Sequence, residues 1–170
     1  PIKRGNALEQ MVCDMYVEKT GRKLKKINLT LFNRNHPKAL GHVDRAIVGD
    51  DRGMGVFEAK TVGMWMDKKI QEEGIPNGYI YQLQWYMQDG WYYLDKNGKE
   101  KSVNFKWGAF GLLSIENWEI TEFDMDKDDD IIQSLRDLNS NFWQNIEDGQ
   151  YPERLKLSDR RCKSCMYRTT

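Results

Sequence analysis

Residues 55–61 read Gly55-Val56-Phe57-Glu58-Ala59-Lys60-Thr61, an apolar segment interrupted by two charged side chains. Its aromatic and β-branched residues, which follow the turn-like run 49–53, predict a β-strand. Side chains at positions i and i+2 of a strand emerge on the same side, so Glu58 and Lys60 share one face. A Glu-x-Lys pair is also common on ordinary exposed strands, so its meaning depends on its surroundings.

A second strand is predicted from about residue 39 to residue 48, and the turn at 49–53 folds it back beside the first. This places Asp44 within reach of Glu58, so that two carboxylates and the Lys60 ammonium group converge. Such oxygen ligands suit Mg²⁺ or Mn²⁺, which bind one or two carboxylates and keep waters for a substrate phosphate. The chemistry that fits is phosphodiester hydrolysis, in which Lys60 orients the nucleophile and offsets negative charge.

The remaining periodicities predict an α/β domain with a central mixed β-sheet flanked by α-helices. Helical spacing is found at 5–21, 64–71, 79–88 and 128–148. Further strands are predicted at 27–32, 107–115 and 118–123. The strand at 27–32 is expected to form an antiparallel meander with those at 39–48 and 55–61, and the polar stretch 95–104 is predicted to be a loop.

With 170 residues, 39% hydrophobic and 31% charged, the chain is long enough for one domain with a sizeable core. We expect a single domain over 1–170, with 152–170 as a cysteine-containing tail. No apolar run approaches the roughly 18 residues of a membrane-spanning helix and no secretory signal is seen, so a cytoplasmic location without membrane contact is expected. Zero net charge gives no overall basic field, so charge neither favours nor excludes DNA. Because the chain opens at Pro1 rather than Met, we expect that an end has been trimmed.

Three segments carry a family resemblance: Gly41-His42-Val43-Asp44-Arg45, then Glu58-Ala59-Lys60-Thr61, then Tyr79-Ile80-Tyr81-Gln82-Leu83-Gln84-Trp85-Tyr86. In this order and spacing they resemble the PD-(D/E)XK nuclease core of RecB-type, phage lambda exonuclease and YqaJ-type recombination nucleases. The resemblance runs from about Gly5 to Tyr86 and implies a restriction-endonuclease-like core. Val43 stands where the motif's namesake proline would be, a departure that such families tolerate.

The resemblance also implies roles for individual residues. Asp44 and Glu58 are expected to be metal ligands, and Lys60 the catalytic lysine. Gln82, with Tyr86 one helical turn away, is expected to face the active site and position DNA or the lysine. The alternative for Gln82 is a helix residue that caps a loop or faces solvent.

Further candidates lie outside the strands at 39–48 and 55–61. In these families the first helix carries an acidic residue near the metal, and Glu9, which matches it in the sequence, is expected to join Asp44 and Glu58 as a metal ligand. His36 and His42 fit a turn residue and a strand-surface residue better than phosphate or metal ligands. Some aromatic residues are placed either to stack on unpaired bases or to fill the core, namely Trp65, Trp85, Trp91, Tyr92 and Tyr93.

The three cysteines are Cys13 in the first predicted helix and the C-x-x-C pair Cys162 and Cys165. They resemble the iron-sulfur branch of these nucleases, which includes AddB-type subunits and CRISPR-associated exonucleases. There, one N-terminal and three C-terminal cysteines hold a [4Fe–4S] cluster, so a fourth cysteine is expected beyond Thr170. The alternatives are a zinc site completed by another ligand, or a buried Cys13 beside a fortuitous C-x-x-C.

The resemblance as a whole implies a Mg²⁺-dependent DNA exonuclease of phage-type recombination or DNA end processing. A single-strand annealing protein is the implied partner, and a homo-oligomer is expected because related exonucleases form rings. One alternative is a non-catalytic DNA-binding or assembly subunit, against which the complete Asp, Glu and Lys set weighs, since burying converging charges costs free energy. The other is a restriction-type endonuclease, against which the Gln-x-x-x-Tyr helix weighs.

Overall fold

The computed structural model describes residues 2–27, 30–156, 158–159 and 161–162. The chain divides into two compact units, Pro1–Asp137 and Leu138–Thr170. Helix α4 (Asp129–Glu147) begins in the first unit and ends in the second. No helix in the described part of the chain is both long and apolar enough to cross a membrane.

A five-stranded sheet forms the centre of the first unit, in the order β1-β4-β5-β8-β9. Strands β5 and β8 run parallel, and the other three neighbouring pairs run antiparallel. The predicted central mixed sheet is therefore confirmed. Its strands are β1 (Lys23–Lys26), β4 (Arg45–Val48), β5 (Gly55–Val62), β8 (Trp107–Ser114) and β9 (Ile120–Asp126).

Four short strands make a second sheet in the order β3-β2-β6-β7: β3 (Leu40–Gly41), β2 (Leu31–Asn33), β6 (Trp91–Leu94) and β7 (Glu100–Ser102). The prediction of one strand over 39–48 is wrong, because β3 and β4 belong to different sheets. Residues 42–44 separate β3 from β4 and belong to no strand. The backbone oxygen of His42 accepts a hydrogen bond from Tyr86, and the Asp44 carboxylate accepts one from Ala59 N. The predicted meander is also wrong, since β1 takes the place beside β4. The predicted loop at 95–104 contains β7.

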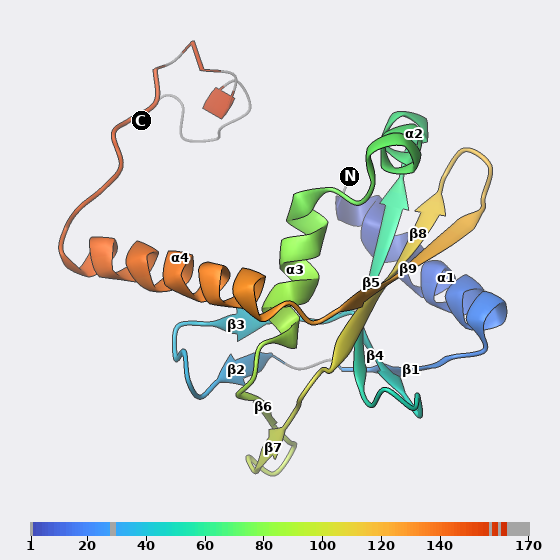
Figure 1. The fold of residues 1–170 in the computed structure, drawn as a ribbon, viewed down its shortest axis with the longest axis horizontal. Helices are drawn as coiled ribbons and strands as arrows, with labels where there is room; N and C mark the ends of the chain where they lie inside the picture. The colour runs from blue at the N-terminus through green and yellow to red at the C-terminus, as the bar shows by residue number, and fades with distance from the viewer. Residues whose placement is uncertain (1, 28–29, 157, 160, 163–170) are drawn as a thin grey trace. The chain divides into compact units, whose positions relative to one another are not determined.

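Helices α1 (Ile2–Thr20) and α3 (Asn77–Met87) cover opposite faces of β5 and β8 (Figure 1). On the α1 side, Val12 and Tyr16 pack against Phe57 in one apolar cluster. On the α3 side, Leu83 packs with Val56 in the other. Glycines allow this close approach, because a Cβ at position 111 would lie 2.8 Å from Phe57 Cζ and one at position 108 would lie 3.1 Å from Leu83 Cδ1. Helix α2 (Met64–Glu73) links β5 to α3.

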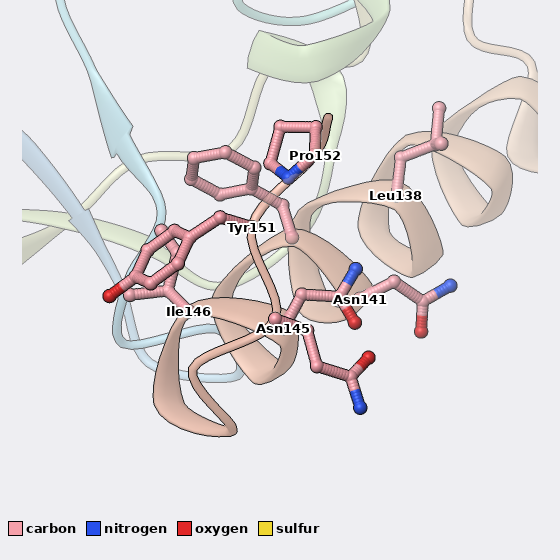
Figure 2. A pocket seen from close by; sticks show the side chains of 8 residues that line it. Leu138, Asn141, Asn145, Ile146, Tyr151 and Pro152 are labelled. Carbon is pink, nitrogen blue, oxygen red and sulfur yellow. The ribbon is translucent and has the colours of Figure 1, made fainter. Parts of the chain in front are cut away.

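In the second unit, residues 150–156 follow α4 without regular secondary structure. Gln150 N donates to Asn145 O at 2.7 Å, which turns this segment back along the helix. Figure 2 shows Tyr151 beside Ile146, and both residues line, with Pro152, a largely apolar pocket of about 720 Å³.

Candidate active site

Strand pairing places Asp44 opposite Glu58. Arg45 of β4 pairs with Phe57 of β5, so continuing this register by one residue sets Asp44 across from Glu58. Asp44 stands directly before β4, and its Oδ2 accepts a hydrogen bond from Ala59 N at 2.8 Å. The carboxylate of Asp44 is thereby fixed against the strand that carries Glu58 and Lys60.

Glu58, Lys60 and Gln82 form a closed hydrogen-bonded triangle. Glu58 Oε1 accepts from Lys60 Nζ at 2.7 Å and from Gln82 Nε2 at 2.6 Å. Lys60 Nζ also donates to Gln82 Oε1 at 2.9 Å, so the amide of Gln82 bridges the other two side chains. Gln82 lies on α3, and its side-chain amide bonds to Lys60 and Glu58 of β5. The ring of Tyr79 lies 5.2 Å from Lys60 Nζ and covers it from the same helix.

The second carboxylate oxygen of Glu58 is left without a partner. Glu58 is only 4% exposed, and its Oε2 is buried with no hydrogen bond from any described residue. Burial, together with the nearby charge of Asp44, raises the pKa of Glu58 to about 7, although Lys60 opposes the shift. Burial also raises the pKa of Asp44, with Glu9 adding to the effect and the Ala59 N–H opposing it. Burying a carboxylate oxygen without a hydrogen bond is costly, and a proton or a bound cation would lower that cost.

Arg45 joins the site to the first helix. Its guanidinium is buried and donates from Nη1 to Glu9 Oε1 at 2.6 Å and to the backbone oxygen of Asp44 at 2.6 Å. A third bond, from Nη2 to Gln10 Oε1, measures 3.0 Å. Glu9 therefore lies near Asp44 but is engaged by Arg45. Within the described residues no group of three or more His, Cys, Asp or Glu side chains is arranged to hold a metal.

A polar pocket of about 430 Å³ opens beside Asp44. Lys26, Thr30 and His42 line it together with Glu9 and Arg45, and His42 Nε2 lies 3.0 Å from Thr30 Oγ1. His42 thus belongs to the rim of the site.

Tyr86 lies one helical turn after Gln82 on α3. Its hydroxyl donates to the backbone oxygen of His42 at 2.6 Å. Burial raises the pKa of Tyr86, and a side-chain hydrogen bond with Gln82 opposes the rise. A Cβ at Gly41 would lie 3.4 Å from the Tyr86 ring, so the glycine lets the chain pass over the ring. His36 lies in the turn after β2, where its backbone N donates to Asn33 Oδ1, apart from these groups.

The cysteines are placed less completely. Cys13 is 2% exposed in the apolar cluster beneath α1, and burial raises the pKa of its thiol to about 11. The thiol therefore packs there as a small apolar group, and a thiolate is disfavoured in this packing. Cys162 lies in the second unit, and Cys165 lies outside the described residues. The [4Fe–4S] cluster stays a prediction.

The role of Arg45 was not predicted from the sequence, although the residue lies within the segment Gly41-His42-Val43-Asp44-Arg45. The available signal was a charged residue placed directly after Asp44 in an otherwise apolar strand, Arg45-Ala46-Ile47-Val48. Such a residue is buried only with partners, and the partners Glu9 and Gln10 lie 36 and 35 positions away. Their identity required the packing of α1.

The mixed sheet, with Asp, Glu and Lys on two neighbouring strands beneath a glutamine-bearing helix, defines a member of the PD-(D/E)XK nuclease superfamily of the lambda exonuclease type. The chain belongs to the family of the YqaJ-like viral recombinase domain, whose model matches residues 1–88. The predicted family is confirmed, and the matched span includes all of Glu9, Asp44, Glu58, Lys60 and Gln82.

Among known proteins, protein YqaJ of Bacillus subtilis strain 168, described as uncharacterized, is 27% identical over 149 residues. The match covers 87% of this chain and 42% of that protein, so the chain spans less than half of this relative's length. The crystal structure of the alkaline exonuclease LHK-Exo from Laribacter hongkongensis matches with a TM-score of 0.63 and 18% identity, over 88% of this chain and 70% of that chain. LHK-Exo in complex with dAMP matches with a TM-score of 0.62 and 21% identity, over 87% and 69%. These structural likenesses show the fold.

Proposed function

We propose that this chain carries the catalytic centre of a divalent-metal-dependent DNA exonuclease that acts in phage-type recombination or DNA end processing. The observation that carries the proposal is the buried carboxylate of Glu58, with one oxygen bound by Lys60 and Gln82 and the other unpartnered next to Asp44. A purely structural ion pair gains nothing from leaving a buried carboxylate oxygen unsatisfied.

The residues present fit Mg²⁺ or Mn²⁺. Both ions take oxygen ligands, and Mg²⁺ is commonly held by one or two carboxylates together with waters and substrate phosphate. Asp44 and Glu58 supply those two carboxylates, and Glu9 forms an ion pair with Arg45, the residue after Asp44. When bound, such an ion polarises a phosphoryl oxygen and makes water more acidic.

The chain's own side chains do the remaining work. Lys60 is held in place by Glu58 and Gln82, so its ammonium group is oriented before substrate arrives. From there it can orient a nucleophilic water and offset the negative charge that develops on the phosphate. Gln82 acts through Lys60 as a positioning residue, and Tyr86 acts through the backbone of His42 in the same way.

Support for DNA and for an exonuclease comes from relatives. The family is described as a viral recombinase domain, and LHK-Exo is an alkaline exonuclease whose structure was obtained with dAMP, a deoxynucleoside monophosphate. A partner annealing protein and a homo-oligomer stay predictions.

The test is digestion of end-labelled linear DNA and of closed circular DNA, with Mg²⁺, with Mn²⁺ and with a chelator. The proposal expects mononucleotides from linear DNA, none from circles, and no reaction with the chelator. Discrete fragments from circular DNA would show an endonuclease instead. Binding of DNA without cleavage under every condition would show a non-catalytic subunit.

A further inference from the structure

We propose that two exposed tryptophans, Trp65 and Trp118, form a stacking surface for unpaired DNA bases beside the catalytic centre. The inference rests on the proposed nuclease function and deepens it, because it names single-stranded DNA as what the site's surroundings recognise. Of the aromatic residues considered from the sequence, the structure buries Trp91 and partly buries Trp85, whose Nε1 donates to Leu40 O. Trp65, by contrast, is 71% exposed.

Both tryptophans lie just beyond the C-terminal ends of the parallel strands β5 and β8. Trp65 is in the first turn of α2, five positions after Lys60, and the chain's reach limits their Cα separation to roughly 17 Å. Trp118 lies in the turn between β8 and β9, and Ile115 N of that turn donates to Val62 O of β5 at 3.0 Å. Figure 1 shows the start of α2 and the β8–β9 turn at this same end of β5.

The backbone at Trp118 is held in a conformation that favours glycine. Its φ is 58°, and it is the one non-glycine residue with positive φ among the residues that the structure describes. A bulky side chain in this region is strained, and such strain persists where a function requires the side chain. Trp118 is nevertheless 52% exposed, so core packing does not account for an aromatic residue here. A glycine would suit the turn better.

The surroundings favour nucleic acid as the occupant. Lys69 Nζ lies 5.4 Å from the Trp65 ring and 3.5 Å from Glu73 Oε2, so a cation that also pairs with a carboxylate accompanies the exposed aromatic face. Met64, 62% exposed, extends the apolar surface next to Trp65. Aromatic faces interleaved with lysine near a phosphate-binding centre are the means by which proteins bind single strands without regard to sequence. A DNA strand whose end is held at Lys60 would have its neighbouring bases within reach of Trp65, five positions further along the chain.

The experiment measures binding of the full chain to a labelled single-stranded oligonucleotide and to a blunt duplex, with divalent ions chelated so that the DNA stays intact. Each base that stacks on an aromatic residue contributes enough that Trp65→Ala should weaken single-strand binding about tenfold. Trp65→Phe should restore most of it, and duplex binding should change less than about threefold. Leu94→Ala, which removes an exposed apolar side chain from β6, is the matched control and should change neither.

Trp118→Gly separates a functional role from a structural one. The variant should keep a thermal unfolding midpoint near that of the native chain, because relief of strain at φ 58° offsets the loss of the half-exposed ring, and should weaken single-strand binding about tenfold. The inference is overturned if both tryptophan variants bind single strands as tightly as Leu94→Ala, or if single-strand and duplex binding fall equally. A change of oligomeric state in the variants would overturn it in favour of a contact between copies. If the tryptophan variants give one of these contradicting results while the native chain cleaves linear DNA, the stacking surface is wrong and the proposed nuclease function stands. If the native chain neither binds nor cleaves DNA, the proposed function is wrong.

Discussion

Glu58 is a carboxyl group whose burial lowers the stability of the fold when the group is ionised. Its carboxyl pKa rises from an ordinary 4.5 to about 7, chiefly through burial. Between these pH values the folded, metal-free chain holds more protons than the unfolded chain, so the free energy of unfolding falls as pH rises through this window. The loss is on the order of 3 kcal/mol, since one pKa unit corresponds to about 1.4 kcal/mol.

We therefore expect Glu58→Gln to be more stable than the native chain at pH 8 in the presence of a chelator, and similar to it at pH 4.5. The amide keeps an oxygen for Lys60 and removes the charge that burial penalises. Denaturant titrations of both chains at the two pH values measure this. Parallel pH dependence in the two chains would show that Glu58 does not titrate in this window. Cleavage of DNA should be lost in the variant.

Glu9 and Asp44 are expected to differ in their effect on metal binding. Asp44→Asn removes a carboxylate from the proposed ion position, whereas Glu9→Gln keeps an oxygen that can accept the hydrogen bond from Arg45. We expect the first change to weaken Mn²⁺ binding at least about tenfold more than the second, measured by calorimetry on metal-free protein. Equal losses would make Glu9 a ligand, as the family resemblance implies.

At the scale of elements, the packing of α1 onto the sheet depends on Gly111 of β8. A Cβ there would lie 2.8 Å from Phe57 Cζ and 3.2 Å from Val12 Cγ1, inside a filled apolar cluster. We expect Gly111→Ala to lower the free energy of unfolding by about 1–3 kcal/mol, as overpacking does. Denaturant titration measures it.

Gly78 provides the matched control, since it lies in α3 and a Cβ there meets nothing within 4 Å. Gly78→Ala should raise stability by roughly 0.5–1 kcal/mol, because glycine is a poor helix former. Equal changes in the free energy of unfolding for the two substitutions would contradict the close packing of α1 against β8.

Whether a segment is a helix or a strand could largely be predicted from the local sequence pattern, but which strands pair in each sheet could not. The helices at 64–71, 79–88 and 128–148 were each predicted within a few residues of α2, α3 and α4, because their apolar spacing is local. The split of the 39–48 stretch into β3 and β4 depends on bonds from Tyr86 and Ala59, which lie far away in the sequence. Local alternation contains no information about those partners.

At the scale of the whole chain, the two units differ in regular structure. Residues 151–156 are exposed and irregular, whereas the first unit holds both sheets. We expect limited trypsin digestion to cut first at Arg154 or Lys156 and to leave a fragment that contains the first unit, because exposed irregular segments are cleaved preferentially. Mass spectrometry of the early products identifies the site. First cleavage in the β6–β7 hairpin, at Lys96 or Lys99, would contradict this. The predicted single domain with a tail from residue 152 stays a prediction.

The closeness of Asp44, Glu58 and Lys60 could be predicted because their motifs are short and two of the three lie on one strand. Glu58 and Lys60 are neighbours on a face of β5, and a single turn suffices to place Asp44. What the sequence could not provide was the unpartnered Glu58 Oε2, the pairing of Glu9 with Arg45, and the exposure of Trp65 and Trp118. Each of these depends on how the helices and turns pack around the sheet.

The most direct measurement compares the rate at which linear end-labelled DNA is digested by the native chain, by Lys60→Ala and by Lys101→Ala, with Mn²⁺ binding and thermal unfolding measured for each. Lys101 is an exposed lysine in β7 and controls for the loss of a positive charge. If Lys60 orients the nucleophile, Lys60→Ala should be slower by at least about 100-fold while it keeps its fold and its Mn²⁺, and Lys101→Ala should match the native rate. Equal rates for the two variants would contradict a nuclease centre built on Asp44, Glu58 and Lys60.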